Sequence, residues 1–216
     1  MYEFDATLCM FSSGNVTEKA RMGRVNAGGQ VVVDLYCGIG YFTIPLLVHA
    51  GAQHVHACDW NPHAAAAMRR NAELNHVSDR ITVYEGDNRC GDAPTQRWRY
   101  VRSDLTVCCC VNHRLVADKL RDVADRVMLG LIPTSQAGWP VAVAVMKPQG
   151  GWMHIHENVH EAKLAEWTAF VASTITKLAA DAGKRWTVAT THLEKVKSYA
   201  PRVFHVVVDL QLVAVE

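Results

Sequence analysis

The sequence lacks an excess of charge, because 22 lysines and arginines are balanced by 21 aspartates and glutamates, for a formal net charge of +1. A strong overall field that would attract nucleic acid or a membrane surface is therefore excluded, and such a partner would have to be met by a local patch. No stretch reaches the roughly 18 uninterrupted apolar residues of a membrane helix. The first residues, Met1 to Asp5, lack the basic and apolar regions of a secretory signal. We therefore expect a cytoplasmic protein that is not held in a membrane.

A metal-binding pattern of cysteines is also missing. The seven cysteines include no C-x-x-C pair, and three of them are consecutive, at Cys108, Cys109 and Cys110. An odd count without a secretion signal indicates reduced thiols. His154 and His156 fall on one face of a predicted strand, but nothing fixes a third and fourth ligand beside them. The sequence therefore predicts no metal, and it predicts that these two histidines line a substrate crevice.

Apolar runs and helical stretches alternate from Val31 to the C-terminus, a pattern typical of a parallel sheet flanked by helices. Half of the 216 residues are hydrophobic, which is enough for one substantial core. The pattern predicts strands at 31–35, 55–58, 81–84, 126–131, 152–155, 187–194 and 203–213. It predicts helices at 41–50, 62–75 and 160–182. The last two strands should form an antiparallel hairpin joined by 195–199, in an α/β protein with a mostly parallel, seven-stranded sheet.

A short unit, 1–28, precedes the main domain, 29–216. Asn15-Val16-Thr17-Glu18 fits a capping box, with Asn15 as the cap of a helix that ends at Gly28. Unpaired N–H groups at a helix start favour an anion. Ser12 precedes this start and Lys19 lies one turn into the helix, so both could bind the same anion. The alternative is a plain capped helix with a solvated lysine.

The turn after the first strand carries features of a nucleoside site. Asp34, Gly38 and Gly40 lie between that strand and the first helix of the sheet region, where glycines let the backbone pass close under a ligand. Asp59 ends the second strand. A carboxylate at this place accepts hydrogen bonds from both ribose hydroxyls in nucleoside-binding Rossmann units.

A third polar feature follows the third strand, where Asp87 and Asn88 can accept from and donate to an adenine edge. NAD competes as the cofactor, but Thr43 stands where the third glycine of G-x-G-x-x-G would be, and no second mononucleotide half follows. Seven strands that end in a hairpin are instead typical of S-adenosylmethionine enzymes. We therefore predict a Rossmann-like, S-adenosylmethionine-dependent transferase fold.

One stretch breaks the alternation. Residues 91–116 show no clean period and contain a basic run interleaved with aromatics, RWRYVR at 97–102. Such a run could stack on bases and pair with phosphates. The plainer explanations are an unstructured insertion or translated intron sequence, since structureless connections longer than about 12–15 residues are uncommon in compact domains. We treat 91–116 as an irregular insertion.

Six ordered blocks carry a family resemblance that covers nearly the whole chain apart from 91–116. They are CMFSSGNVTEK at 9–19, VDLYCGIGYFT at 33–43, HACDWNPH at 56–63, GDNR at 86–89, ADRVMLGLIP at 124–133 and VKSYAP at 196–201. With these blocks the chain resembles the tRNA wybutosine-synthesising aminocarboxypropyltransferases. That family is related to the tRNA guanosine-N1 methyltransferases, which act beside the anticodon.

The resemblance implies a cofactor site and a reaction. S-adenosylmethionine would be bound by Ser12, Lys19, Asp59, Asp87 and Asn88. Its 3-amino-3-carboxypropyl group would pass to a tricyclic guanosine-derived base, 4-demethylwyosine, in phenylalanine tRNA, with 5'-methylthioadenosine as the leaving product. The base would lie in a crevice beside Arg89, Pro133, Lys197 and Tyr199.

Two other functions stay open at this point. The first is N1-methylation of guanosine in tRNA, which differs in the carbon that is transferred. Three carbons flank the sulfonium of the cofactor, and the way the protein holds the cofactor decides which one faces the nucleophile. Lys19 and the helix start could anchor the carboxylate for aminocarboxypropyl transfer. The second is a cofactor-binding protein without catalytic activity. We expect tRNA as the partner and a monomeric protein, and no general base is identified.

Overall fold

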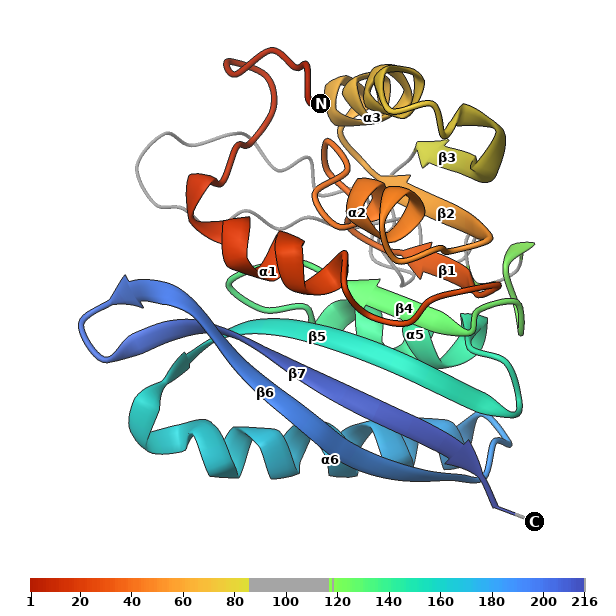
Figure 1. Ribbon diagram of the computed structural model, residues 1–216. Helices are drawn as coiled ribbons and strands as arrows, with labels where there is room; N and C mark the ends of the chain where they lie inside the picture. Colours follow the sequence, from red (N-terminus) through yellow and green to blue (C-terminus); the bar gives the residue numbers. More distant parts are fainter. Residues whose placement is uncertain (86–116, 118, 216) are drawn as a thin grey trace, which may run out of the picture.

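The computed structural model describes residues 1–85, 117 and 119–215. Figure 1 shows one twisted sheet with helices on both of its faces. The strands are β1 (Val31–Asp34), β2 (His54–Asp59), β3 (Ile81–Glu85), β4 (Arg126–Leu129), β5 (Gly150–His160), β6 (Trp186–Ala200) and β7 (Val203–Ala214). The sheet order is β3-β2-β1-β4-β5-β7-β6, with β5, β7 and β6 paired antiparallel and the other pairs parallel. The predicted fold class is therefore confirmed.

The hydrophobic core has one part on each face of the sheet, between the sheet and the helices that cover it. The helices are α1 (Val16–Met22), α2 (Thr43–Val48), α3 (Pro62–Leu74), α5 (Trp139–Val145) and α6 (Leu164–Asp181). Neighbouring valines of β1 serve both parts, because successive side chains of a strand point to opposite faces. Val32 packs with Leu46 of α2 on one face, and Val33 packs with the cluster that contains Trp139 and Val171 on the other.

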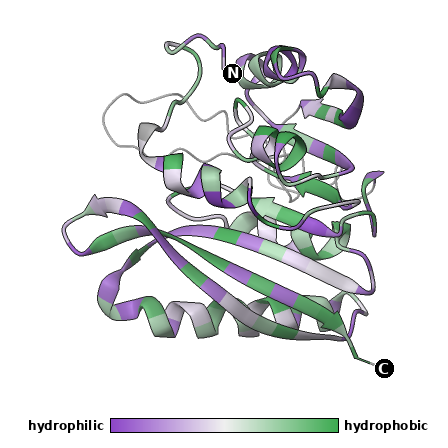
Figure 2. Cartoon of the chain, in the orientation of Figure 1, coloured by the Kyte–Doolittle hydropathy of each residue, from purple (hydrophilic) through white to green (hydrophobic). Residues whose placement is uncertain are grey.

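The antiparallel end of the sheet is longer than the sequence pattern predicts. β5 pairs with β7 along its whole length, from Gly150 opposite Val213 to His160 opposite Val203. Figure 2 shows that hydrophilic segments interrupt β5, which explains why the predicted strand, 152–155, is shorter than the observed one. Residues 195–199 are not the predicted connection but the last part of β6. β6 is an edge strand, and its pairing with β7 shifts register in three places.

The N-terminal helix differs from its prediction. α1 ends at Met22, and Gly23 rather than Gly28 follows it as the C-cap. The capping box is wrong, because Asn15 makes no side-chain capping bond and Glu18 is fully buried, where it pairs with Arg21. A short 3₁₀ turn, η1 (Ser13–Asn15), leads into the helix instead. Tertiary pairing of Glu18 has therefore overridden the local capping pattern.

One observed helix is absent from the predictions, and one predicted region is not described by the structure. The helix α5 was not predicted, because the run WPVAVAV has the alternation and β-branching of a strand. The irregular insertion 91–116 lies outside the described residues. Within 1–85 and 119–215, no helix is long and apolar enough to cross a membrane.

Candidate functional site

The turn between β1 and α2 is organised around a buried carboxylate. Asp34 is fully buried and accepts a hydrogen bond from Thr43 Oγ1 at 2.7 Å and one from the Tyr36 N–H at 3.4 Å. Burial raises the pKa of Asp34 to about 7. Asp34 therefore ties the end of β1 to the start of α2 and shapes the turn from within, rather than presenting its carboxylate at the surface of the turn.

The two glycines of the turn take conformations that other residues avoid. Gly38 has φ +53° and donates its N–H to Asp59 Oδ2 at 2.8 Å. Gly40 has φ +98°, and a Cβ at this position would lie 2.6 Å from the sulfur of Met68 and 3.0 Å from Ile44. The turn therefore packs closely on α3 at Gly40, while the N–H of Gly38 faces Asp59.

Asp59 ends β2 with its side chain almost buried, 9% exposed. Its carboxylate accepts the Gly38 N–H at 2.8 Å and the Asn61 N–H at 2.9 Å. Burial raises the pKa of Asp59, and these backbone hydrogen bonds oppose the rise. A carboxylate offers about four acceptor positions, so Asp59 retains capacity for hydroxyl donors of a ligand.

Lys19 is half-buried in a cage of three aromatic rings. Its Nζ atom is 5.1 Å from the ring centre of Tyr41 and 5.7 Å from those of Tyr2 and Phe11. Burial lowers the pKa of Lys19. Among the residues that the structure describes, no carboxylate forms an ion pair with it. The cation–π contacts hold the ammonium group in place and leave its charge for an anion.

Ser12 connects three parts of the chain. Its N–H donates to Tyr41 Oη at 2.7 Å, and Tyr41 directly follows Gly40 of the glycine turn. Lys197 Nζ on β6 donates to Ser12 Oγ at 3.0 Å. The predicted residues Ser12 and Lys197, 185 positions apart in the sequence, are thus brought together, and both lie beside the aromatic cage of Lys19 through Tyr41.

The remaining predicted residues fall into two groups. Asp87, Asn88 and Arg89 lie outside the described residues. Tyr199 lies two residues beyond Lys197 on β6 and is half exposed. Pro133 follows a cis peptide bond after β4, and its carbonyl accepts the N–H of Asn158 on β5.

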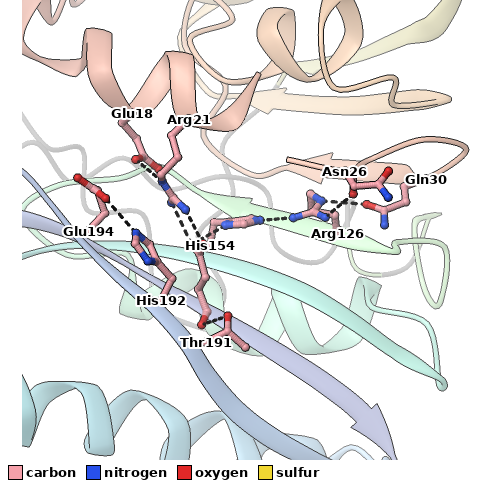
Figure 3. Close-up of polar contacts among 10 residues, drawn as sticks. Glu18, Arg21, Asn26, Gln30, Arg126, His154, Thr191, His192 and Glu194 are labelled. Atoms are coloured by element: carbon pink, nitrogen blue, oxygen red, sulfur yellow. Dashed lines mark hydrogen bonds and ion pairs between the residues drawn. The ribbon is translucent and has the colours of Figure 1, made fainter. Parts of the chain in front are cut away.

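The prediction that His154 and His156 line an open crevice is wrong, because both are buried. His154 Nδ1 donates to Asp209 Oδ1 at 2.7 Å. Figure 3 shows His154 between Arg21 and Arg126. His156 Nδ1 lies 2.9 Å from His205 Nε2, and its ring packs on Phe42. Burial lowers the pKa of both His154 and His156. No group of three or more His, Cys, Asp or Glu side chains in the described ranges could hold a metal ion.

Sequence reasoning missed the aromatic side of the site. Tyr2, Phe11 and Tyr41 surround Lys19, and Phe4 stacks on Phe11 with ring centres 5.2 Å apart. The available signal was the recurrence of aromatic residues at 2, 4 and 11 in a segment with no strand or helix pattern. Local periodicity gives no indication that this segment folds against Tyr41.

The sheet with its antiparallel end, and the glycine turn facing an acidic residue on β2, define the class of Rossmann-like S-adenosylmethionine-dependent transferases. Within this class, the chain belongs to the family of the TRM5/TYW2 methyltransferase domain, whose model matches residues 1–109. The family resemblance of the sequence blocks is thereby confirmed.

Individual relatives and solved structures are similar to the chain over nearly its whole length. A tRNA wybutosine-synthesizing protein 2 homolog of Danio rerio is 44% identical over 241 residues, which cover 97% of this chain and 52% of the relative. The crystal structure of M. jannaschii TYW2 in complex with AdoMet is 28% identical, with a TM-score of 0.76, over 99% of this chain and 82% of that one. P. horikoshii TYW2 in complex with MeSAdo is 29% identical, with a TM-score of 0.74, over 98% and 67%. The chain spans about half the length or less of the curated relatives it matches.

Proposed function

We propose that the protein transfers the 3-amino-3-carboxypropyl group of S-adenosylmethionine to 4-demethylwyosine, next to the anticodon of phenylalanine tRNA, in wybutosine biosynthesis. The observation that carries this proposal is the hydrogen bond from the Ser12 N–H to Tyr41 Oη. It joins the N-terminal unit, with Ser12 and Lys19, to the glycine turn that faces Asp59. Groups suited to the two ends of one nucleoside-amino acid cofactor therefore lie beside the same turn.

The residues present fit the nucleoside end of this cofactor. Asp59 keeps acceptor capacity for ribose hydroxyls after binding the Gly38 and Asn61 N–H groups. Gly38 carries no side chain that would obstruct a ligand, and Gly40 allows the turn to pack on α3 behind it. Asp34 holds the turn in shape through Thr43. In this proposal Asp87 and Asn88 bind the adenine.

Lys19 and Ser12 would bind the amino-acid end. The cofactor supplies an electrophilic carbon next to a positively charged sulfur, and the protein selects the carbon by orientation. Lys19 offers a partly desolvated charge without a carboxylate partner in the described part of the chain, and a desolvated charge binds an anion more strongly than a solvated one. Holding the carboxylate there would turn the γ-carbon, instead of the methyl group, toward the substrate base.

The substrate base would enter beside the hairpin of β6 and β7. Lys197 is held on Ser12, and Tyr199 exposes an aromatic ring two residues further along β6. An exposed aromatic ring can stack on a base. Pro133, on the loop after β4, and Arg89 complete the proposed crevice. We take the protein to act on tRNA in the cytoplasm as a monomer. The names of the wybutosine-synthesizing relatives favour this function over guanosine methylation.

The test uses S-adenosylmethionine with one isotope in the methyl group and another in the carboxyl group. The substrate is tRNA from cells blocked before the aminocarboxypropyl step. Carboxyl label in tRNA without methyl label supports the proposal, whereas methyl label alone would establish a methyltransferase. Cofactor binding without either label would indicate a protein that lacks catalytic activity.

A second arm tests the anchor. Lys19→Ala should weaken cofactor binding at least about tenfold in isothermal titration, since a hydrogen-bonded charge pair contributes roughly 1.5–3 kcal/mol. Lys177→Ala, on the exposed side of α6, is the matched control and should bind as the wild type does. Unchanged binding by Lys19→Ala would show that the carboxylate is held elsewhere.

A further inference from the structure

A buried set of charged side chains connects α1 to the antiparallel end of the sheet (Figure 3). Glu18 is fully buried and accepts two hydrogen bonds from the Arg21 guanidinium, at 2.8 and 2.7 Å. The same guanidinium donates to both carboxylate oxygens of Asp209 on β7, at 2.5 and 3.1 Å. Arg21 therefore binds two buried carboxylates at once, one on its own helix and one on the sheet.

The set continues from Asp209 to the segment between α1 and β1. His154 Nδ1 donates to Asp209, and its Nε2 accepts a hydrogen bond from Arg126 on β4. Arg126 also donates to the side chain of Gln30 at 2.9 Å and to the carbonyl of Asn26 at 3.1 Å. His154 thus lies between Asp209 and Arg126, and the set as a whole contains two carboxylates and two guanidiniums, so its charges balance.

This connection matters because α1 has little stability of its own. It is seven residues long and begins without a side-chain cap. Isolated helices shorter than about 12–15 residues are marginal in water, so tertiary contacts must hold α1 in place. Met22 supplies an apolar contact, but only Arg21 among the described α1 residues forms an ion pair with the sheet. Removing one member of a buried charge pair leaves the other uncompensated, so the loss of Arg21 should strongly destabilise the packing of α1 on the sheet.

We propose that Arg21, held by Asp209, is a positioning residue that sets Lys19 against the amino-acid end of the cofactor. Arg21 lies two residues from Lys19, and residues two apart on a helix face different sides. Arg21 therefore contacts the sheet while Lys19 enters the aromatic cage. This inference rests on the proposed function, because Lys19 is taken as the cofactor anchor there.

A double-mutant cycle tests the inference. The dissociation constant of S-adenosylmethionine is measured for the wild type, Arg21→Met, Lys19→Ala and the double variant. We expect Arg21→Met to bind about tenfold more weakly, and the double variant to bind no more weakly than Lys19→Ala alone. A purely structural role of Arg21 would lower the affinity in both backgrounds, and such additivity would overturn the proposal.

The control and the second variant separate positioning from misfolding. Arg70→Met removes another guanidinium, which pairs with Glu73 three residues along its helix and with Glu3. These exposed ion pairs contribute little, so the variant should bind S-adenosylmethionine as the wild type does. Asp209→Asn keeps the size of the side chain and should reproduce the effect of Arg21→Met. If both Arg21→Met and Asp209→Asn remain folded and bind as the wild type does, the proposal is wrong.

Hydrogen exchange without cofactor distinguishes this proposal from the proposed function. The amides of 12–22 should exchange faster in Arg21→Met than in the wild type and in Arg70→Met. A wild type that fails to bind S-adenosylmethionine would refute the proposed function, yet the exchange rates would still report whether Arg21 holds α1. Equal exchange in all three proteins would refute the positioning role itself.

Discussion

The glycine turn gives the sharpest stability prediction, Gly40→Ala. An alanine at φ +98° is strained by about 1–3 kcal/mol. Its Cβ would also lie 2.6 Å from the Met68 sulfur and 3.0 Å from Ile44, and overpacking of this kind costs about 1–3 kcal/mol more. We therefore expect the free energy of unfolding to fall by roughly 2–6 kcal/mol.

Urea denaturation followed by circular dichroism measures this change, and Gly29→Ala is the matched control. Gly29 also has positive φ, +72°, but a Cβ there meets nothing within 4 Å. The control should therefore show the conformational cost alone, on the order of 1 kcal/mol. Equal losses for the two variants would refute the packing argument at Gly40. A loss confined to Gly40→Ala would instead show that backbone strain contributes little.

Three further predictions follow from buried polar groups. Burial raises the pKa of Asp34 from 3.8 to about 7, so the folded state retains a proton that the unfolded chain loses, and stability should fall as pH rises between these values. In urea titrations over this pH range, Asp34→Asn should lose up to roughly 4 kcal/mol less stability than the wild type. Parallel pH profiles of the two proteins would contradict this prediction. Burial, with Lys197 nearby, lowers the pKa of His205 from 6.5 to about 4, so wild-type stability should drop as pH falls through this window by up to roughly 3 kcal/mol. His205→Gln should not share that drop, which thermal unfolding at pH 4.5 and 7 would reveal. Trp186→Phe removes the 2.8 Å bond to the Pro148 carbonyl and should cost about 1 kcal/mol, whereas no change in the urea midpoint would show that the bond contributes nothing.

Much of the fold follows from local sequence signals. The β-branched run at β1, the proline at the first position of α3 and the alternation in β7 each place an element close to its observed bounds. The lengths of β5 and β6 could not be predicted in this way. The polar residues of β5 are mostly buried, whereas those of β6 lie on a largely exposed edge strand, and in both cases hydropathy alone ends the strand too early. α5 was missed because burial decides its conformation against its local preference.

The candidate site could likewise be predicted only in part from the sequence. Gly38 and Asp59 could be identified because Gly38 lies in the turn after β1 and Asp59 ends β2, and a parallel sheet gathers ligand-binding residues at this edge. The contact between Ser12 and Lys197 was not apparent from spacing, since 185 residues separate them. Glu18 was misassigned because its local pattern fits a cap, whereas a long-range partner of Arg21, Asp209, decides where both side chains lie.

The irregular pairing of β6 has a consequence for behaviour at high concentration. A long edge strand exposes unpaired N–H and carbonyl groups that can template pairing with a second molecule. β6 has 15 residues, but its register shifts at 190–192, 195–197 and 198–200 break that exposed row into short pieces. Glu194, Lys195 and Lys197 add charges to the same edge. The strand that closes the sheet is therefore a poor template for intermolecular β-sheet, which protects the protein from aggregation along its longest open edge.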